Sequence, residues 1–157
     1  MTALASRAQL RASFVRWALF FVPVVLLLGF LSGVVAGSGA DNPWFAALEK
    51  PSLYPPPATF GIAWTILYVL MGLSAATVAV AWGARGRTLA MALFAIQLGL
   101  NLAWSPVFFA MHELHWALYL IFALDFAVVL TIVGFWRVRR QAGLLLLPYL
   151  VWIAFAT

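Results

Sequence analysis

The chain has 157 residues, of which 66% are hydrophobic and only 8% are charged. A soluble surface needs roughly a quarter of charged residues, so this composition excludes a soluble globular protein and indicates an integral membrane protein. Cysteine is absent, which excludes disulfides, thiolate metal sites and cysteine nucleophiles. The net charge of +5 does not indicate binding to nucleic acid, because the basic residues stand beside hydrophobic runs, where they orient a membrane protein.

The first hydrophobic run covers residues 17–36 and follows a segment that carries Arg7, Arg11 and Arg16 but no acidic residue. With about 20 residues it is longer than the core of a typical signal peptide and long enough to span a bilayer. We therefore expect a signal anchor that forms the first transmembrane helix. Pro23 predicts a bend in this helix, because proline cannot donate a helical hydrogen bond.

A proline-rich stretch, residues 37–59, follows. Its four prolines between residues 51 and 57 fix φ and remove backbone donors, so we expect a long loop and not a helix. Trp44 can anchor this loop at the membrane interface. The helical pattern resumes at Phe60, and Trp64 and Tyr68 then lie four residues apart on one helix face. The loop therefore delivers its residues to the mouth of a helix bundle.

The apolar runs predict five transmembrane helices, over residues 17–36, 60–82, 88–110, 114–136 and 143–157. The expected fold is an all-α membrane bundle in a single domain that covers residues 1–157. The last run would form only about 22 Å of helix against a hydrocarbon core of about 30 Å. Either this span is incomplete or the chain stops early.

The basic residues are distributed unevenly between the two sides of the membrane. The N-terminus, the second-to-third turn and the fourth-to-fifth turn hold three, two and three of the nine Lys and Arg residues, whereas the opposite side holds only Lys50. The positive-inside rule therefore places the N-terminus in the cytoplasm. The loop and the turn from His112 to His115 then share the outer face, where Trp116 can serve as a second interfacial anchor.

The third expected helix carries polar side chains on one face, because Gln97, Asn101, Trp104 and Ser105 are spaced i, i+4, i+7 and i+8. Amides in hydrocarbon are costly unless they are partnered. Pro106 frees a backbone carbonyl one turn earlier, which an Asn or Ser side chain can satisfy. One interpretation is that these residues only join helices. Together with the aromatic residues of the second helix, they instead predict a pocket with aromatic walls and an amide at its base.

The other edge of this helix carries three small residues at four-residue spacing, Ala95, Gly99 and Ala103. Such a stripe allows helices to approach closely, either in a homodimer or within one chain, and both interpretations stay open.

Asp125 is the only acidic residue within a span. It could handle protons or ions, or it could be protonated and hydrogen-bonded, since no second carboxylate completes a relay.

His112 and His115 flank Glu113 in the short outer turn. Two histidines could bind a metal ion, but without a third ligand they are more typical of an interfacial turn, so we expect no metal site. The sequence has no Ser-His-Asp set, glycine-rich phosphate loop or zinc motif. A conventional hydrolase or an ATP-driven pump is therefore not expected.

Three separated motifs are specific enough to indicate a family. They are Lys50-Pro51, Pro55-Pro56, Phe60, Trp64-Thr65 and Leu67-Tyr68; then Gln97, Asn101 and Trp104-Ser105-Pro106-Val107-Phe108-Phe109; then Pro148-Tyr149-Leu150, Trp152 and Phe155-Ala156-Thr157. They closely resemble the TspO/MBR family, the tryptophan-rich sensory proteins related to the translocator protein or peripheral-type benzodiazepine receptor. The resemblance implies a five-helix bundle, usually dimeric, that binds porphyrins such as protoporphyrin IX and, in relatives, cholesterol and benzodiazepine-type drugs.

Carried over by motif, the resemblance implies a ligand pocket beneath the loop, lined by Trp64, Tyr68, Asn101, Trp104, Trp152 and Ala156. We add two loop residues to the ligand-binding set, Trp44 and Lys50, because the Lys50 ammonium could meet a ligand propionate. The family commonly has aromatic residues at the positions of Leu53 and Ala58, so porphyrin stacking by the loop does not carry over. The cholesterol motif of the mitochondrial relatives lies beyond the end of this sequence.

We therefore expect a membrane receptor or regulator that binds porphyrins and has no obligatory cofactor. The alternative is a transporter of tetrapyrroles or sterols. Enzymatic activity is not expected, although the light-dependent porphyrin degradation reported for some relatives leaves that question open. The expected partners are the lipid bilayer, a second copy of the chain, and porphyrin, sterol or benzodiazepine-type ligands. The charge pattern favours a bacterial inner membrane, while some members of the family are placed in the outer one.

Overall fold

The computed structural model of the chain describes residues 7–39, 41–50 and 52–156, with only the backbone of Ala156. Its elements are α1 (Arg7–Ala36), α2 (Pro43–Ala46), α3 (Pro57–Ala79), α4 (Arg87–Ser105), the π-helix η1 (Pro106–Ala110), α5 (Leu114–Val138) and α6 (Arg140–Ala156). No strand occurs in the described ranges. Four of their helices are long and apolar enough to cross a membrane, and α6 is a shorter apolar helix. The all-α membrane bundle expected from the sequence is confirmed.

Four helices begin earlier than the sequence predicted, and α4 does so by a single residue, at Arg87. α1 begins at Arg7 and not at residue 17, so it includes the arginine-rich segment. α3 begins at Pro57 and not at Phe60, because proline suits the first helical position, where no N–H is needed and φ is already helical. α6 begins at Arg140, which gives this helix 17 residues and a length of about 26 Å.

The ends of two helices also differ from the predicted ones. α3 ends at Ala79 and not at residue 82. The guanidinium of Arg87 donates two hydrogen bonds to the Ala79 carbonyl, at 3.1 and 2.7 Å, and so satisfies the end of the helix. α5 continues to Val138, two residues beyond the predicted end at 136.

The predicted loop, residues 37–59, is not one continuous helix, but it contains the short helix α2, which the sequence did not predict. Asn42 caps α2 by accepting a hydrogen bond from the backbone N–H of Phe45 at 3.2 Å, and Pro43 takes the first helical position. Gly37 ends α1 with a φ of +72°, a left-handed conformation that glycine adopts without strain. Residues 41–50 and 52–56 are called the lid below.

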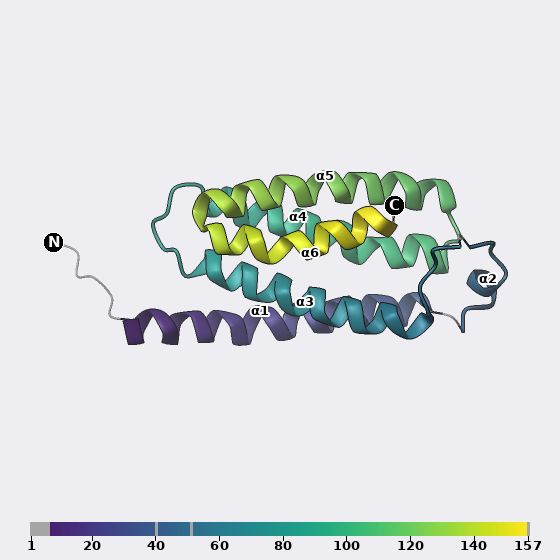
Figure 1. Cartoon of the computed structure of the whole chain (residues 1–157), viewed down its shortest axis with the longest axis horizontal. Helices are drawn as coiled ribbons and strands as arrows, with labels where there is room; N and C mark the ends of the chain where they lie inside the picture. The colour runs from purple at the N-terminus through teal and green to yellow at the C-terminus, as the bar shows by residue number, and fades with distance from the viewer. Residues whose placement is uncertain (1–6, 40, 51, 157) are drawn as a thin grey trace.

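The long helices form a ring, in which α1 packs against α3, α3 against α6, α6 against α5, α5 against α4, and α4 against α1. Figure 1 shows α2 at one end of the bundle, and the α3–α4 and α5–α6 turns at the other. We call these the lid end and the arginine end. The arginine end is named for the exposed side chains of Arg85 and Arg139 in its two turns and of Arg137 in the last turn of α5.

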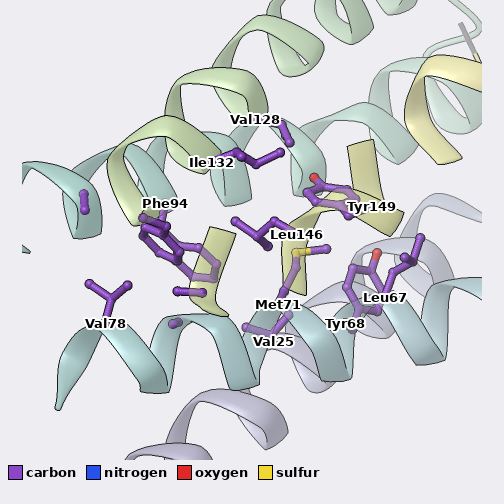
Figure 2. Close-up of a cluster of buried hydrophobic side chains, with 14 of the residues drawn as sticks. Val25, Leu67, Tyr68, Met71, Val78, Phe94, Val128, Ile132, Leu146 and Tyr149 are labelled. Carbon is purple, nitrogen blue, oxygen red and sulfur yellow. The ribbon is translucent and has the colours of Figure 1, made fainter. Parts of the chain in front are cut away.

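A buried apolar core joins the helices of the ring. Figure 2 shows its side chains pointing toward one another from every long helix, among them Val25, Met71, Phe94, Val128 and Leu146. α1 and α3 cross closely at Gly72, where an added Cβ would lie 2.6 Å from the Cα of Val22. Small residues allow membrane helices to approach in this way.

The predicted third span divides into α4 and η1 at Pro106. Pro106 has no N–H to donate to the Leu102 carbonyl, which lies one turn earlier. The hydroxyl of Ser32 donates to this carbonyl at 2.6 Å. The sequence predicted the freed carbonyl and an Asn or Ser partner, but the serine comes from α1. Ser32 thereby ties α1 to α4.

Candidate functional site

Polar side chains from α3, α4 and α6 form a buried chain of hydrogen bonds. The Tyr68 hydroxyl donates to Oδ1 of Asn101 at 3.4 Å, and Nδ2 of Asn101 donates to the Tyr149 hydroxyl at 2.8 Å. Tyr149 in turn donates to Oε1 of Gln97 at 2.9 Å. This series of hydrogen bonds ends at Nε2 of Gln97, a buried donor with no hydrogen-bond partner in the described part of the structure. We call these four residues the polar chain.

The polar chain decides what Asn101 does in this structure. The sequence left two roles for it, a bond to the ligand or a bond between helices. Both its terminal atoms are engaged by tyrosines, one from α3 and one from α6, and its side chain is only 8% exposed. Asn101 therefore joins helices, and its bond to a ligand stays a prediction. The Tyr68 ring packs directly against Gly29 of α1, where an added Cβ would collide with it.

Two tryptophan rings, one from α3 and one from α6, lie in the same region, and the one from α3 contacts the polar chain. Trp64 lies with its ring centroid 5.3 Å from that of Tyr68 and 6.2 Å from that of Tyr149. Trp152 meets Phe60 edge to face at 5.8 Å. Both tryptophans are half-buried, so part of each ring is available for contact. The structure thus brings the two predicted residues of α3 together, and Trp152 meets the same helix through Phe60. The side chain of Ala156 lies outside the described ones.

Trp104 turns toward α5. Its ring stacks on Phe108 at 4.7 Å with an interplanar angle of 12°, and its Nε1 donates to the Ala117 carbonyl at 3.2 Å. Asn101 and Trp104, both predicted on one helix face to line the pocket, therefore point to different partners: Asn101 bonds α3 and α6, while Trp104 bonds the first turn of α5. Trp104 reaches the lid through Phe108, which meets Trp44 at 5.2 Å and Phe45 at 6.0 Å.

The lid is docked on η1 and the turn after it. Trp44 stacks on the ring of His112 at 4.3 Å with an interplanar angle of 10°. Phe45 contacts Phe109 at 5.2 Å and Tyr54 at 6.0 Å. Nδ2 of Asn42 donates to the Phe109 carbonyl at 3.3 Å. Burial raises the pKa of the Tyr54 phenol, so its hydroxyl stays neutral. The lid therefore closes this end of the bundle with aromatic rings.

Lys50 is directed into the lid. Its ammonium donates to the carbonyls of Phe45 at 3.0 Å and Leu48 at 3.1 Å. It also lies 4.7 Å from the centroid of the Phe45 ring and 5.7 Å from that of Tyr54, within the range of a cation–π contact. In this conformation Lys50 satisfies one carbonyl of the last turn of α2 and one of the residues that follow α2. Its predicted contact with a ligand propionate would require it to leave them.

A hollow of about 690 Å³ opens beside the lid on the outer face of α6. It is lined by Pro55, Leu147, Pro148, Val151, Trp152 and Phe155, all of them apolar. Trp152 therefore borders both this hollow and Phe60 of α3. An apolar molecule in the bilayer could reach Trp152 from this side.

Other residues that the sequence singled out lie apart from this region. Ala95, Gly99 and Ala103 are exposed, and a Cβ added at Gly99 would meet nothing within 4 Å. The interpretation that this stripe packs within the chain is therefore wrong. Asp125 is half-buried in α5. Within the described ranges no three His, Asp or Glu side chains are grouped so that they could hold a metal ion.

Sequence reasoning missed the central position of Tyr149 and the aromatic contacts of Phe45 and Phe108. Tyr149 stands three residues before Trp152, a spacing that places both on one helix face, and this signal could have added it to the site. Phe45 and Phe108 carried no such signal, because their neighbours come from segments far apart in the sequence.

Comparison with known proteins agrees with this architecture. The model of the TspO/MBR family matches residues 21–157. A tryptophan-rich protein TspO of Archaeoglobus fulgidus is 42% identical over 135 residues, which cover 85% of this chain and 85% of the relative. TspO of Chlorobaculum tepidum is 43% identical over 137 residues, 87% of this chain and 86% of the relative. The human translocator protein is 37% identical over 135 residues, 83% and 78% of the two chains. This chain belongs to the TspO/MBR family.

Proposed function

We propose that this chain is a membrane receptor or regulator that binds a porphyrin of the protoporphyrin IX type beneath the lid. The observation that carries the proposal is the position of the half-buried Trp64 of α3 against two tyrosines of the buried polar chain. Trp152 of α6, also half-buried, packs on Phe60 of the same helix α3. Flat aromatic ligands are suited to such walls, and a few fixed polar groups orient them. The resemblance of the chain to the TspO/MBR family supports the same ligand class.

In this proposal Trp64 and Trp152 contact the faces of the macrocycle, and the polar chain forms the floor. The lid and Trp104 close the site from the end of the bundle. Tyr149 is fully buried and Tyr68 is only 7% exposed, so the ligand rests above the floor or displaces one of these rings. Lys50 is the cation of the lid that could pair with a ligand propionate. It would first have to release its hydrogen bond to the Phe45 carbonyl of α2.

Titration of protoporphyrin IX against the tryptophan fluorescence of the purified protein tests the proposal directly. We expect saturable quenching at micromolar ligand. The Trp152→Leu variant should bind about tenfold more weakly, because one stacked ring contributes about 1 kcal/mol or more. Trp136→Leu, at the arginine end, is the matched control and should bind as the wild type does. Quenching that never saturates, or equal losses in both variants, would contradict the proposal.

Asn101→Leu separates the two roles of this amide when stability and affinity are measured on one preparation. If Asn101 bonds the ligand, the folded protein should bind protoporphyrin IX about tenfold more weakly, as the loss of one hydrogen bond of about 1.4 kcal/mol predicts. A loss of stability with unchanged affinity removes Asn101 from the ligand site.

Transport of tetrapyrroles or sterols across the membrane is the alternative function. The apolar hollow beside Trp152 favours it, because a lipophilic ligand could pass between the bilayer and the lid end along α6. Reconstituted vesicles test this alternative: time-dependent accumulation of ligand without stoichiometric binding supports transport, and binding without accumulation supports the receptor. Benzodiazepine-type drugs are a second ligand class to titrate in the same assay.

Light-dependent degradation of the bound porphyrin is a further activity that the tryptophans could support by donating electrons. Irradiation of the complex, with absorbance of the porphyrin as the readout, tests it. Loss of absorbance that depends on Trp64 and Trp152 supports an enzymatic role, and equal loss with denatured protein removes it.

The assembly and the topology are proposals that rest on an exposed stripe of small residues and on the distribution of the arginines. The exposed stripe of Ala95, Gly99 and Ala103 supports a homodimer in the bilayer. Gly99→Leu should convert the dimer to a monomer without changing the melting temperature.

The arginine end is proposed to face the cytoplasm, in the inner membrane of a bacterium. A single cysteine placed at Ser52 should react with a membrane-impermeant reagent only from the outside, and labelling from the cytoplasm alone would reverse the topology.

A further inference from the structure

A second hollow at the lid end has a carboxylate and exposed aromatic rings in its wall. Its volume is about 490 Å³, and it is lined by Val107, Met111, Glu113, Trp116, Tyr119 and Leu120. These residues come from η1, from the turn that follows it and from the first turns of α5. In Figure 1 the start of α5 lies at the same end of the bundle as α2. The lining includes no member of the polar chain and none of the tryptophans of the proposed porphyrin site.

Glu113 contributes little to the helix that it precedes. It occupies the N-cap position of α5, yet its side chain makes no capping hydrogen bond. The side chains that cap helices well are the shorter ones of Asp, Asn, Ser and Thr. The Glu113 side chain is exposed and lines the hollow instead. Its carboxylate is therefore available to a cation from outside the chain.

The rest of the wall is suited to the same kind of occupant. Trp116 is 65% exposed and Tyr119 is 60% exposed, and their rings meet edge to face at 6.0 Å. Aromatic faces attract ammonium groups, and Trp and Tyr prefer the headgroup level of a bilayer. Val107, Met111 and Leu120 complete an apolar wall. The hollow therefore fits a molecule with a cationic head and an apolar body.

We propose that this hollow binds a phospholipid with an ammonium headgroup, with the ammonium at Glu113 and the upper acyl chain on the apolar wall. The lipid is the occupant because the hollow opens on the exposed faces of η1 and α5, which the bilayer surrounds in a transmembrane bundle. An anionic headgroup without an ammonium is disfavoured by repulsion from the carboxylate. The hollow beside Trp152 has no charged residue in its wall and should not select between headgroups.

Native mass spectrometry of the purified protein tests this selectivity, independently of porphyrin binding. The protein is offered equal amounts of phosphatidylethanolamine and phosphatidylglycerol with the same acyl chains, and the retained lipids are counted. We expect the wild type to retain phosphatidylethanolamine over phosphatidylglycerol by about fivefold, which corresponds to one ion pair with an aromatic contact. Glu113→Gln should reduce the ratio to about twofold or less.

Glu49→Gln is the matched control, because Glu49 is also an exposed carboxylate at the lid end but does not line the hollow. It should keep the wild-type ratio. Glu113→Lys should invert the ratio in favour of phosphatidylglycerol, a change of sign that partial misfolding cannot produce. Melting curves of the variants should match that of the wild type, because the Glu113 side chain is exposed and makes no capping bond.

Three outcomes would overturn the proposal. The first is a wild type that retains both lipids equally, and the second is a Glu113→Gln variant with the wild-type ratio. The third is a hollow that is covered by a second copy of the chain: Trp116→Leu would then reduce the oligomer to a smaller species in size-exclusion chromatography and leave the lipid ratio unchanged.

Discussion

The two ends of the bundle are packed in different ways. Toward the arginine end, Met71 and Leu146 are at most 1% exposed, and Phe94 stacks on Phe135 at 5.7 Å. Ser74, a polar side chain in this region, is fully buried and donates to the Ala142 carbonyl at 2.7 Å. Such packing leaves little space for a ligand or for movement.

Toward the lid end, the contacts are mostly between aromatic rings that stay partly exposed. Trp64, Trp152, Phe60 and Phe108 are all half-buried. The lid reaches Phe108 through Phe45 and Phe60 through Tyr54. A ring can rotate or shift against another ring at a small cost, whereas interlocked aliphatic chains cannot. The comparison indicates that the arginine end supplies stability, while the lid end keeps surfaces that a ligand can use.

The largest effect is expected where α1 and α3 cross at the closely packed end. In Gly72→Leu the added Cβ would lie 2.6 Å from the Cα of Val22, a backbone atom that cannot move without shifting α1. We expect the free energy of unfolding to fall by about 3 kcal/mol or folding to fail. Thermal melting in detergent measures it. Gly61→Leu is the control in the same helix, because nothing lies within 4 Å of its added Cβ; equal melting of the two variants would refute the comparison.

The polar chain marks the boundary between the two ends, and Asn101→Leu should destabilise the protein by about 1–3 kcal/mol. The change removes the partner of Tyr68 and one partner of Tyr149 while both stay buried. Gln97→Leu should cost clearly less, because it also removes a buried donor that has no partner in the described part of the chain. Chemical unfolding of both variants in detergent provides the comparison. A larger loss for Gln97→Leu would mean that another group holds its amide.

The sequence predicted those parts of the fold that depend on local patterns. Apolar runs located the spans, Pro106 marked the freed carbonyl, and the spacing of Gln97 and Asn101 placed both amides on one buried face. The predicted bounds of the helices were less accurate, because capping residues decide where a helix begins and ends. Pro57 begins α3 because its fixed φ is already helical. The helix α2 could have been predicted from Asn42 and the proline after it, a cap followed by a first helical residue.

The partners across the bundle could not be predicted in the same way. Tyr149 of α6 donates to Gln97 of α4, although these two helices are not neighbours in the ring. Such a contact depends on the order of the helices, which is not a local property of the sequence. The same reason explains why Ser32 meets the Leu102 carbonyl. Trp104 shares a helix face with Asn101 by spacing, but its indole N–H is held by α5 and not by the other walls of the pocket.

The lid should open without unfolding the rest of the bundle. Lys50→Met removes the hydrogen bonds from the ammonium to the carbonyls of Phe45 and Leu48, so we expect a local loss of about 1 kcal/mol and about fivefold faster hydrogen exchange at lid amides. The melting temperature should stay unchanged, because the arginine end is untouched. Glu49→Gln is the control, because it removes a neighbouring charge at an exposed side chain. It should leave the hydrogen exchange of the lid amides unchanged. If Lys50→Met lowers the melting temperature instead, the lid and the bundle form one cooperative unit.

The smallest effect is expected at Ser32, whose hydroxyl donates to the carbonyl that Pro106 leaves free. Ser32→Ala should lower the free energy of unfolding by about 0.6 kcal/mol, the usual size of a side-chain hydrogen bond between membrane helices. Thr65→Val is the matched control, because the Thr65 hydroxyl also donates to a backbone carbonyl at 2.6 Å. That carbonyl belongs to Gly61 of the same helix, and the bond lies on an exposed face. This control should change stability less.

Pro106→Ala sharpens the test of this bond, because alanine returns a backbone N–H that can serve the Leu102 carbonyl. In the Pro106→Ala background, Ser32→Ala should therefore cost less than it does alone. A double-mutant cycle in detergent measures this coupling between α1 and α4. If the two changes are additive, the Ser32 hydroxyl stabilises the helix pair by packing alone, and the freed carbonyl is satisfied by another group.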